Sequence, residues 1–478
     1  MIFESPQALQ SSSFKPSVCI IGSGPAGISL ALKLERKKIP CLIVEAGGFE
    51  YDAEVQDAYR STVVGDPYYD LAIARLRFFG GTSGHWAGWC RPLDEVDFEP
   101  RSGIDKSGWP LRKKHLDPYA AETQSILEIL AIQPDDRLND RIKEVHLSFS
   151  PPVRFGKKYR KQIEASPLIG LLTYSPVVDI VPVRDRIDHV KVRDRQGGLH
   201  PIAARMFCVC TGGIENSRML LWSNRLHGGG VVPKADALGR YWMEHPHIGV
   251  GEAVLFTFTG MRVDKGMRFY APTPQFMQAQ QIGNFGVRLF AGESLTKALI
   301  RDGLCHSPKF FEDLAKKADA GLVCGAEVRL AWEQVPVATN RIELDEASDA
   351  NGMARTKLFW KKGPLERRTA VTAMQQFAGY LAESDRGRVK IASWLTEGKD
   401  YPEEAEKAGF HHMGGTRMAA SPADGVVDSD CKVFGVDNLY VGGASVFPTG
   451  GHSNPTYTIV QLALRIGDHI AGRLQAGA

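Results

Sequence analysis

A glycine-rich turn between two short apolar runs constrains the fold of this chain more than any other feature. The runs Val18–Ile21 and Cys41–Val44 are separated by the turn at residues 22–27 and by a helical pattern. Glycines at positions 22, 24 and 27 permit a tight turn, a close approach of a phosphate to the backbone, and close packing of helix on strand. Glu45 ends the second run, where a carboxylate accepts hydrogen bonds from a ribose and disfavours a 2′-phosphate. The pattern predicts a dinucleotide-binding unit, FAD or NAD, with a glycine-rich turn of an unrelated parallel sheet as the alternative.

Length and composition indicate a globular protein with two joined domains. The chain of 478 residues is longer than a domain with a single hydrophobic core usually is. Lys and Arg number 58 against 55 Asp and Glu, a net charge of +3 that gives no indication of nucleic acid or of an anionic membrane. The eight cysteines show no metal-ligand spacing, so we expect no metal and a reducing compartment. Without an apolar leader or a run of about 18–20 apolar residues, a cytoplasmic protein with no membrane span is expected.

A second glycine-rich segment, at residues 75–89, combines small residues with two tryptophans. Its core reads Gly80-Gly81-Thr82-Ser83-Gly84-His85-Trp86. Such a segment is neither helix nor regular strand, and it predicts a loop that lies against a flat ring system. An isoalloxazine ring suits so long a segment better than nicotinamide does. The alternative is a tryptophan-anchored loop between domains.

The order of the remaining patterns predicts an α/β protein whose nucleotide domain is discontinuous. A buried run at 206–210 leads into Thr211 and Gly212 at the start of a helix, and residues 438–474 supply another strand and a long helix. Alternating runs at 326–335 and 341–344 predict strands of one antiparallel sheet, and residues 365–383 a helix. We therefore assign residues 1–16 to a tail, 17–100, 166–250 and 406–478 to a Rossmann-like domain, and 101–165 and 251–405 to a substrate domain.

The candidate catalytic residues lie near the end of the chain. His411 and His412 precede the pair Gly414-Gly415, and a glycine-rich turn at 448–454 ends in Asn454 before the last helix. A neutral imidazole accepts a proton near neutral pH, and a side-chain amide fixes the position of an oxygen. This pair beside a glycine-rich cofactor loop predicts alcohol oxidation. His452, two residues before Asn454, is a candidate for the pocket wall.

These motifs, in this order, resemble those of the glucose–methanol–choline (GMC) family of FAD-dependent oxidoreductases, in particular its shorter members that oxidise sugars and polyols. The resemblance covers nearly the whole chain and implies FAD. It implies His411 as general base and Asn454 as its partner, with hydride transfer to the flavin N5, and His452 and His412 as pocket residues. The implied cofactor contacts are Gly22, Gly24, Pro25, Ala26, Gly27, Glu45, Ala46, Gly80, Thr82, Ser83, His85, Trp86, Val178, Thr211, Gly212, Gly443, Ala444, Asn454, Pro455 and Thr456.

Several alternatives remain open at this point. Non-covalent FAD is expected, with a covalent bond at His85 as the alternative, because some family members bond a histidine of a similar motif to the flavin. The expected substrate is a secondary hydroxyl of a sugar, glycoside or polyol, and the electron acceptor can be oxygen, a quinone or a partner protein. The alternative functions are a redox-neutral lyase or isomerase that retains FAD, an NAD-dependent dehydrogenase, and a non-catalytic flavoprotein subunit. The sequence leaves the oligomeric state open. His245 and His247 flank a proline, and a structural loop is favoured there over a metal site.

Overall fold

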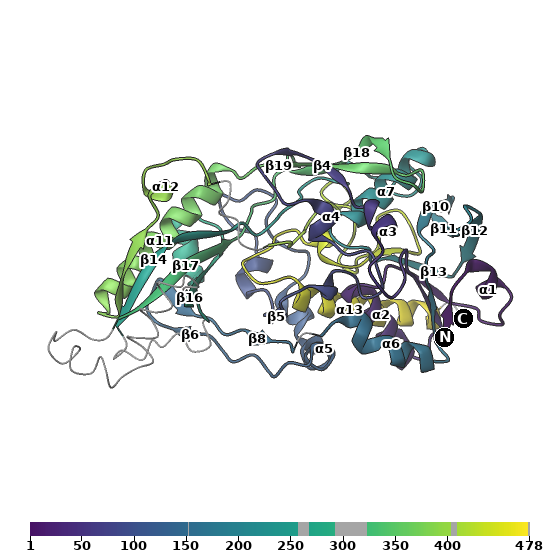
Figure 1. Cartoon of the computed structure of the whole chain (residues 1–478), viewed down its shortest axis with the longest axis horizontal. Helices are drawn as coiled ribbons and strands as arrows, with labels where there is room; N and C mark the ends of the chain where they lie inside the picture. Colours follow the sequence, from purple (N-terminus) through teal and green to yellow (C-terminus); the bar gives the residue numbers. More distant parts are fainter. Residues whose placement is uncertain (152, 257–266, 292–322, 403–408, 477–478) are drawn as a thin grey trace.

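The fold places a parallel sheet and its helices at one end of the molecule and an antiparallel sheet at the other (Figure 1). It is described here from a computed structural model, which describes residues 1–478 except 152, 257–266, 292–322, 403–408 and 477–478. The two chain ends lie at the end that holds the parallel sheet (Figure 1). The predicted α/β class, with a Rossmann-like sheet and a second antiparallel sheet, is confirmed.

The parallel sheet carries the glycine-rich turns at the carboxyl ends of its strands. Its strands in spatial order are β1 (Ile2–Phe3), β9 (Ile169–Leu172), β3 (Cys41–Val44), β2 (Val18–Ile21), β13 (Met206–Val209) and β21 (Leu439–Val441). The central strands are apolar along their whole length because both faces are covered, as in other parallel sheets. The segment predicted as a tail supplies the edge strand β1, in which Ile2 pairs with Leu171.

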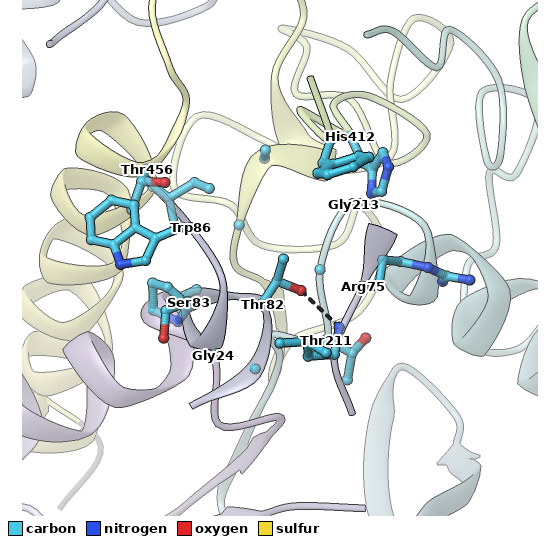
Figure 2. A pocket seen from close by; sticks show the side chains of 18 of the residues that line it. Gly24, Arg75, Thr82, Ser83, Trp86, Thr211, Gly213, His412 and Thr456 are labelled. Atoms are coloured by element: carbon cyan, nitrogen blue, oxygen red, sulfur yellow. Dashed lines mark hydrogen bonds between the residues drawn. The ribbon is translucent and has the colours of Figure 1, made fainter. Parts of the chain in front are cut away.

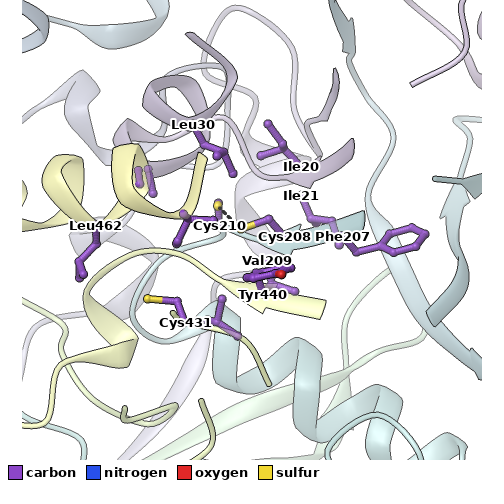
Figure 3. Close-up of a cluster of buried hydrophobic side chains, with 14 of the residues drawn as sticks. Ile20, Ile21, Leu30, Phe207, Cys208, Val209, Cys210, Cys431, Tyr440 and Leu462 are labelled. Carbon is purple, nitrogen blue, oxygen red and sulfur yellow. Dashed lines mark hydrogen bonds between the residues drawn. The ribbon is translucent and has the colours of Figure 1, made fainter. Parts of the chain in front are cut away.

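The helices of this half are α2 (Pro25–Arg36), α7 (Glu215–Leu226), α6 (Phe155–Ala165), α13 (Thr456–Ala476) and α5 (Ala120–Leu127), which packs on α13. Figure 3 shows the core between them, where Ile20 and Val209 of the strands lie near Leu30 of α2 and Leu462 of α13. The helices α2 and α13 pack against each other although hundreds of residues separate them. The first and last segments of the chain therefore form one layer beside the turn at residues 22–27.

The antiparallel sheet forms the wall opposite the parallel sheet. Its strands in spatial order are β20 (Gly387–Ile391), β14 (His247–Phe256), β17 (Val323–Trp332), β16 (Phe285–Ala291), β15 (Met267–Pro272), β7 (Ile142–Glu144) and β6 (Asp136–Arg137). The helix α11 (Pro364–Glu383) covers one face, where Phe377 and Met374 pack on the sheet. Because side chains alternate along a strand, the other face is left to polar and aromatic groups that point toward the parallel sheet.

Three further sheets connect these two. They contain β10 (Val177–Val183), β11 (Arg186–Arg193) and β12 (Leu199–Ala203); β18 (Arg341–Ser348), β19 (Ala354–Trp360) and β4 (Ser61–Gly65); and β5 (Trp89–Cys90) with β8 (Ser148–Phe149). The strand predicted at 341–344 therefore does not join the sheet of β17, because β19 pairs with β4 instead. The helix α6 lies within residues 101–165 but packs on α2 and β9 of the parallel sheet. The remaining α-helices of the described residues are α1 (Pro6–Gln10), α3 (Ala53–Asp57), α4 (Leu71–Ala74), α8 (Pro274–Gln280) and α12 (Ser393–Thr396).

Candidate active site

A cavity of about 390 Å³ lies between the carboxyl ends of the parallel strands and the antiparallel sheet. Figure 2 shows Trp86 and Thr456 on one side of it and Arg75 and His412 on the other, with Thr82 between them. Ligands of open parallel sheets bind at this end of the strands, where successive crossovers leave a crevice. The cavity is therefore the candidate active site.

Most of the predicted cofactor residues line this cavity, although they come from segments far apart in the sequence. They are Gly22, Gly24, Pro25, Ala26, Glu45, Ala46, Thr82, Ser83, His85, Trp86, Thr211, Gly212, Gly443, Ala444, Asn454, Pro455 and Thr456. Three predicted residues do not line it. Gly27 and Gly80 serve backbone packing, since an added Cβ would lie 2.0 Å from the Gly22 oxygen and 2.3 Å from the Gly156 nitrogen, respectively. Side-chain alternation along β10 brings Val177, and not Val178, to the cavity.

His411 and Asn454 meet at the cavity wall, and the hydrogen bonds around them fix the proton positions. The Gly450 carbonyl can only accept, so Nε2 of His245, 3.3 Å away, carries the proton. Nδ1 of His245 then accepts from Nδ1 of His411 at 3.0 Å. Nε2 of His411 consequently holds a lone pair and accepts from Nδ2 of Asn454 at 3.0 Å. The wall presents an unprotonated imidazole nitrogen beside an amide donor.

Glu244 holds the backbone of both histidines. Its carboxylate accepts from the backbone N–H groups of His245 and His411, each at 2.8 Å, and from the hydroxyl of Tyr68. His412 lies 3.0 Å from the same hydroxyl through Nε2 and also lines the cavity. A buried carboxylate with several donors is rigid, so the position of the His411 ring relative to Asn454 is set from outside the cavity.

His452 does not line the main cavity. Its ring lies on a small neighbouring cavity, 3.6 Å from Asp94, and would contact any side chain added at Gly286. The turn from Gly450 to Asn454 brings only its last residue to the wall, because the earlier residues pack beneath the antiparallel sheet. His452 therefore supports the wall from behind.

Burial keeps the histidines of the site neutral. It lowers the pKa of His411 well below 6.5, and the charges of His245, Arg288 and His412 act in the same direction. Burial likewise lowers the pKa of His245 to about 3, and the pKa of His247 falls well below its ordinary value. At neutral pH the imidazole of His411 is a base ready to accept a proton.

Comparison with known proteins identifies a family domain in this chain. Residues 336–463 match the family model described as GMC oxidoreductase.

The chain carries a GMC oxidoreductase C-terminal domain.

The chain is 24% identical to 2-methyl-1,2-propanediol dehydrogenase of Mycolicibacterium austroafricanum over 97% of both proteins. It is also 24% identical to the fructose dehydrogenase large subunit of Gluconobacter japonicus over 58% of this chain and 49% of the relative. Among solved structures, pyridoxine 4-oxidase from "Mesorbium loti" matches with a TM-score of 0.57 and 16% identity, over 95% of this chain and 99% of that one. Formate oxidase matches with a TM-score of 0.57 and 14% identity, over 97% and 100%.

FAD is the cofactor of this GMC oxidoreductase, and the cavity residues fit it. The helix α2 begins at Pro25 after its N-cap residue Gly24, whose side-chain position is open, with no described atom within 4 Å of an added Cβ. The free N–H groups of that first turn suit a diphosphate. Glu45 lies at the end of β3, buried and held by the hydroxyl of Ser23 at 2.5 Å, where a ribose hydroxyl would be bound. The loop of Thr82, Ser83 and Trp86 forms the wall that would hold the ring.

The structure adds three residues to this GMC site that sequence analysis did not assign to it. His245 contacts His411, while His247 and Arg288 line the cavity. The two histidines were interpreted as a structural loop because the spacing between them fits no metal site. Their role depends on contact with residues 166 positions away for His245 and 41 positions away for His247, for which the local sequence holds no signal. Arg288 follows the alternation of a strand whose apolar neighbours face α11, and that alternation was a signal available in the sequence.

No helix in the described part of the chain has the length and apolar character needed to cross a membrane.

Proposed function

We propose that this GMC oxidoreductase oxidises a secondary hydroxyl group of a sugar, a glycoside or a polyol to a carbonyl. The observation that carries the proposal is the lone pair on Nε2 of His411 beside the amide of Asn454, both at the wall of the FAD cavity. The names of the relatives support the substrate class, since they include a diol dehydrogenase and a fructose dehydrogenase subunit. A shorter match, 40% identical over 14% of both chains, is to C-glycoside 3-oxidase of Microbacterium trichothecenolyticum.

The proposed chemistry divides the work between two side chains. A substrate hydroxyl placed between them donates its proton to Nε2 of His411, and its oxygen accepts a hydrogen bond from Nδ2 of Asn454. Loss of that proton makes the carbinol carbon a better electron donor. Bound FAD supplies the two-electron acceptor for that carbon. The imidazolium formed on His411 is stabilised through Nδ1, whose proton is held by His245.

The Oδ1 atom of Asn454 is a second indication that a ligand binds beside His411. It is buried, and in the described part of the chain it finds no hydrogen-bond partner. A buried acceptor without a partner is unfavourable unless a ligand supplies a donor. A substrate hydroxyl next to the reacting one would satisfy it, as a sugar or a polyol can.

The test is anaerobic mixing of the purified yellow protein with a panel of sugars, glycosides and polyols. Loss of the flavin colour with one class of alcohol, and formation of the matching ketone, is the expected result. A redox-neutral lyase or isomerase would convert its substrate while the flavin stays oxidised with every alcohol. That outcome would overturn alcohol oxidation and favour the redox-neutral lyase or isomerase.

A further inference from the structure

Arg288 is a buried guanidinium on the cavity wall. It lies in β16, where Phe285, Val287 and Leu289 face α11, so that its side chain points the opposite way, toward the parallel sheet. The residue is 3% exposed and lines the cavity together with His411. Its side chain lies between the rings of Trp89, 4.8 Å away, and Phe269, 5.8 Å away.

The described residues provide Arg288 with no carboxylate partner. Among the described residues its one side-chain hydrogen-bond partner is His247, whose ring nitrogens lie 3.2 and 3.4 Å from Nη1. Most other buried arginines are paired with carboxylates. Arg91 pairs with Asp94 and Asp135, Arg101 with Glu333, and Arg218 with Glu215 and Asp349. Arg417 is buried without one in the described residues, but it donates to the Lys106 carbonyl and does not line the cavity. Among the described arginines that line the cavity, Arg75 and Arg77 lie 3.5 and 3.4 Å from Glu215, and Arg288 alone has no carboxylate partner.

A buried guanidinium without an anion is unfavourable, because desolvation of the charge is not offset by a counter-charge. Burial and the neighbouring Arg329 lower the pKa of Arg288 to about 9, so the group still carries its charge at neutral pH. Nε and Nη2 make no hydrogen bond to described residues. A planar fork of free N–H donors at a cavity wall has the geometry that binds a carboxylate through two parallel hydrogen bonds.

We propose that the substrate of this enzyme is a hydroxy acid, whose carboxylate binds Arg288 while its hydroxyl group lies between His411 and Asn454. The inference rests on the proposed alcohol oxidation and specifies its substrate class. A single negative charge fits better than a phosphate dianion. Arg288 is the cation of the described cavity lining that has no carboxylate partner, and the histidines beside it are held neutral by burial.

The first test compares matched alcohols with and without a carboxylate in anaerobic flavin reduction. Glucuronate is paired with glucose, and glycerate with glycerol. We expect kcat/KM of the acid to exceed that of its neutral counterpart by about 10–100-fold in the wild-type holoenzyme, the range for a charge-assisted pair. In Arg288→Met this preference disappears, because kcat/KM of the acid falls at least tenfold more than that of the neutral alcohol. Equal loss for acid and neutral alcohol would overturn the assignment.

Arg329→Met is the matched control. Arg329 lies directly opposite Arg288 on β17, pairs with Glu327 at 2.8 Å, and does not line the cavity. Its removal deletes one positive charge from the same sheet, and the preference for acids should survive. A loss of preference equal to that of Arg288→Met would show a general effect of charge and overturn a carboxylate contact.

The second test measures binding without turnover. Hexanoate and neutral hexanamide are titrated into the holoenzyme while the flavin spectrum and the heat of binding are followed. Wild type should bind hexanoate at least tenfold more tightly, Arg288→Lys should keep part of the difference, and Arg288→Met should lose it. Binding of hexanoate with no reduction by any alcohol would overturn the proposed oxidation and leave the carboxylate site standing. Flavin reduction by alcohols, with equal affinity for hexanoate and hexanamide, would overturn the carboxylate site and leave the proposed oxidation standing.

Thermal unfolding of the ligand-free protein provides a check on folding. Replacement of an unpaired buried charge by a side chain of similar volume is neutral or stabilising, so Arg288→Met should keep or raise Tm. A structural arginine would instead lower it. A marked fall in Tm for Arg288→Met, with the hexanoate affinity of the folded Arg288→Met protein unchanged, would assign Arg288 to the scaffold and overturn the proposal.

Discussion

The amide Nδ2 of Asn454 lies 3.0 Å from Nε2 of His411, and it joins the start of the last helix to a loop more than forty residues earlier. The ring cannot turn away, because Nδ1 of His411 is bound to His245 on its other side. The lone pair of Nε2 thus stays directed at the cavity. This arrangement leads to tests of each partner.

Replacement of His411 by alanine should lower kcat/KM for flavin reduction by about 10²–10⁴-fold, the usual contribution of a general base. The reason is that no other base in the chain of hydrogen bonds faces the same oxygen. Stopped-flow reduction over a range of alcohol concentrations measures the effect, with flavin content as the check on folding. His469→Ala, on the outer side of α13, is the control and should keep its rate. Unchanged reduction in His411→Ala would remove this residue from the mechanism.

Asn454→Asp should move the acidic limb of the kcat/KM profile to higher pH. A carboxylate beside Nε2 stabilises the imidazolium, so it raises the pKa of His411 from its depressed value, and less neutral base remains at a given pH. The wild type should show no such limb near neutral pH. Asn454→His, which keeps an N–H donor without a negative charge, should leave the limb near its wild-type position. A limb at the same pH in wild type and Asn454→Asp would contradict the assigned contact.

The buried histidines should make stability fall in acid. Burial lowers the pKa of His412 to about 3, with Arg75 acting in the same direction, and His245 is lowered similarly. Below about pH 6.5 the unfolded chain takes up protons that the folded chain excludes, so each such histidine removes about 1.4 kcal/mol of unfolding free energy per pH unit. Urea unfolding over this range measures the slope. His412→Gln should make the slope shallower, and an identical slope would contradict the shift.

Two glycines of the first turn should respond differently to alanine. In Gly27→Ala the new Cβ lies 2.0 Å from the Gly22 oxygen, so α2 must move away from β2, at a cost of about 1–3 kcal/mol or more. In Gly24→Ala the position is open and φ is −70°, so the fold is kept while the methyl group narrows the approach of the diphosphate. Tm should fall in the first variant, and the ratio of flavin to protein in the second. Equal Tm losses would contradict this distinction.

The attachment of FAD is tested by acid precipitation of the purified protein. His85 lies on the cavity wall with its ring stacked at 6.1 Å from Phe410, and burial lowers its pKa. We expect non-covalent FAD, and therefore yellow colour in the supernatant. Colour that stays in the pellet of the wild type and is lost in His85→Ala would establish the covalent bond instead.

The nucleotide-binding half was predictable because its signals are local. Two apolar runs, the glycines between them and Glu45 lie within thirty residues, and the structure forms β2, α2 and β3 with the expected strand bounds. The assignment of strands in the middle of the chain to particular sheets was not predictable in the same way. Alternation in 341–344 identifies a strand, but its partner β19 is shared with β4, almost three hundred residues earlier. Strand pairing depends on which edges meet, and periodicity within one strand does not encode that choice.

The sequence by itself determined the class of cofactor fold, the candidate base and its amide partner, since each is carried by short motifs with fixed spacing. Only the tertiary structure decided which side chains surround them. It placed His245 behind His411, moved His452 from the wall to its support, and brought Arg288 into the cavity. The physical reason is that burial and charge pairing arise from contacts between distant segments, and an arginine becomes unpaired only when the fold has placed every carboxylate elsewhere within the described chain.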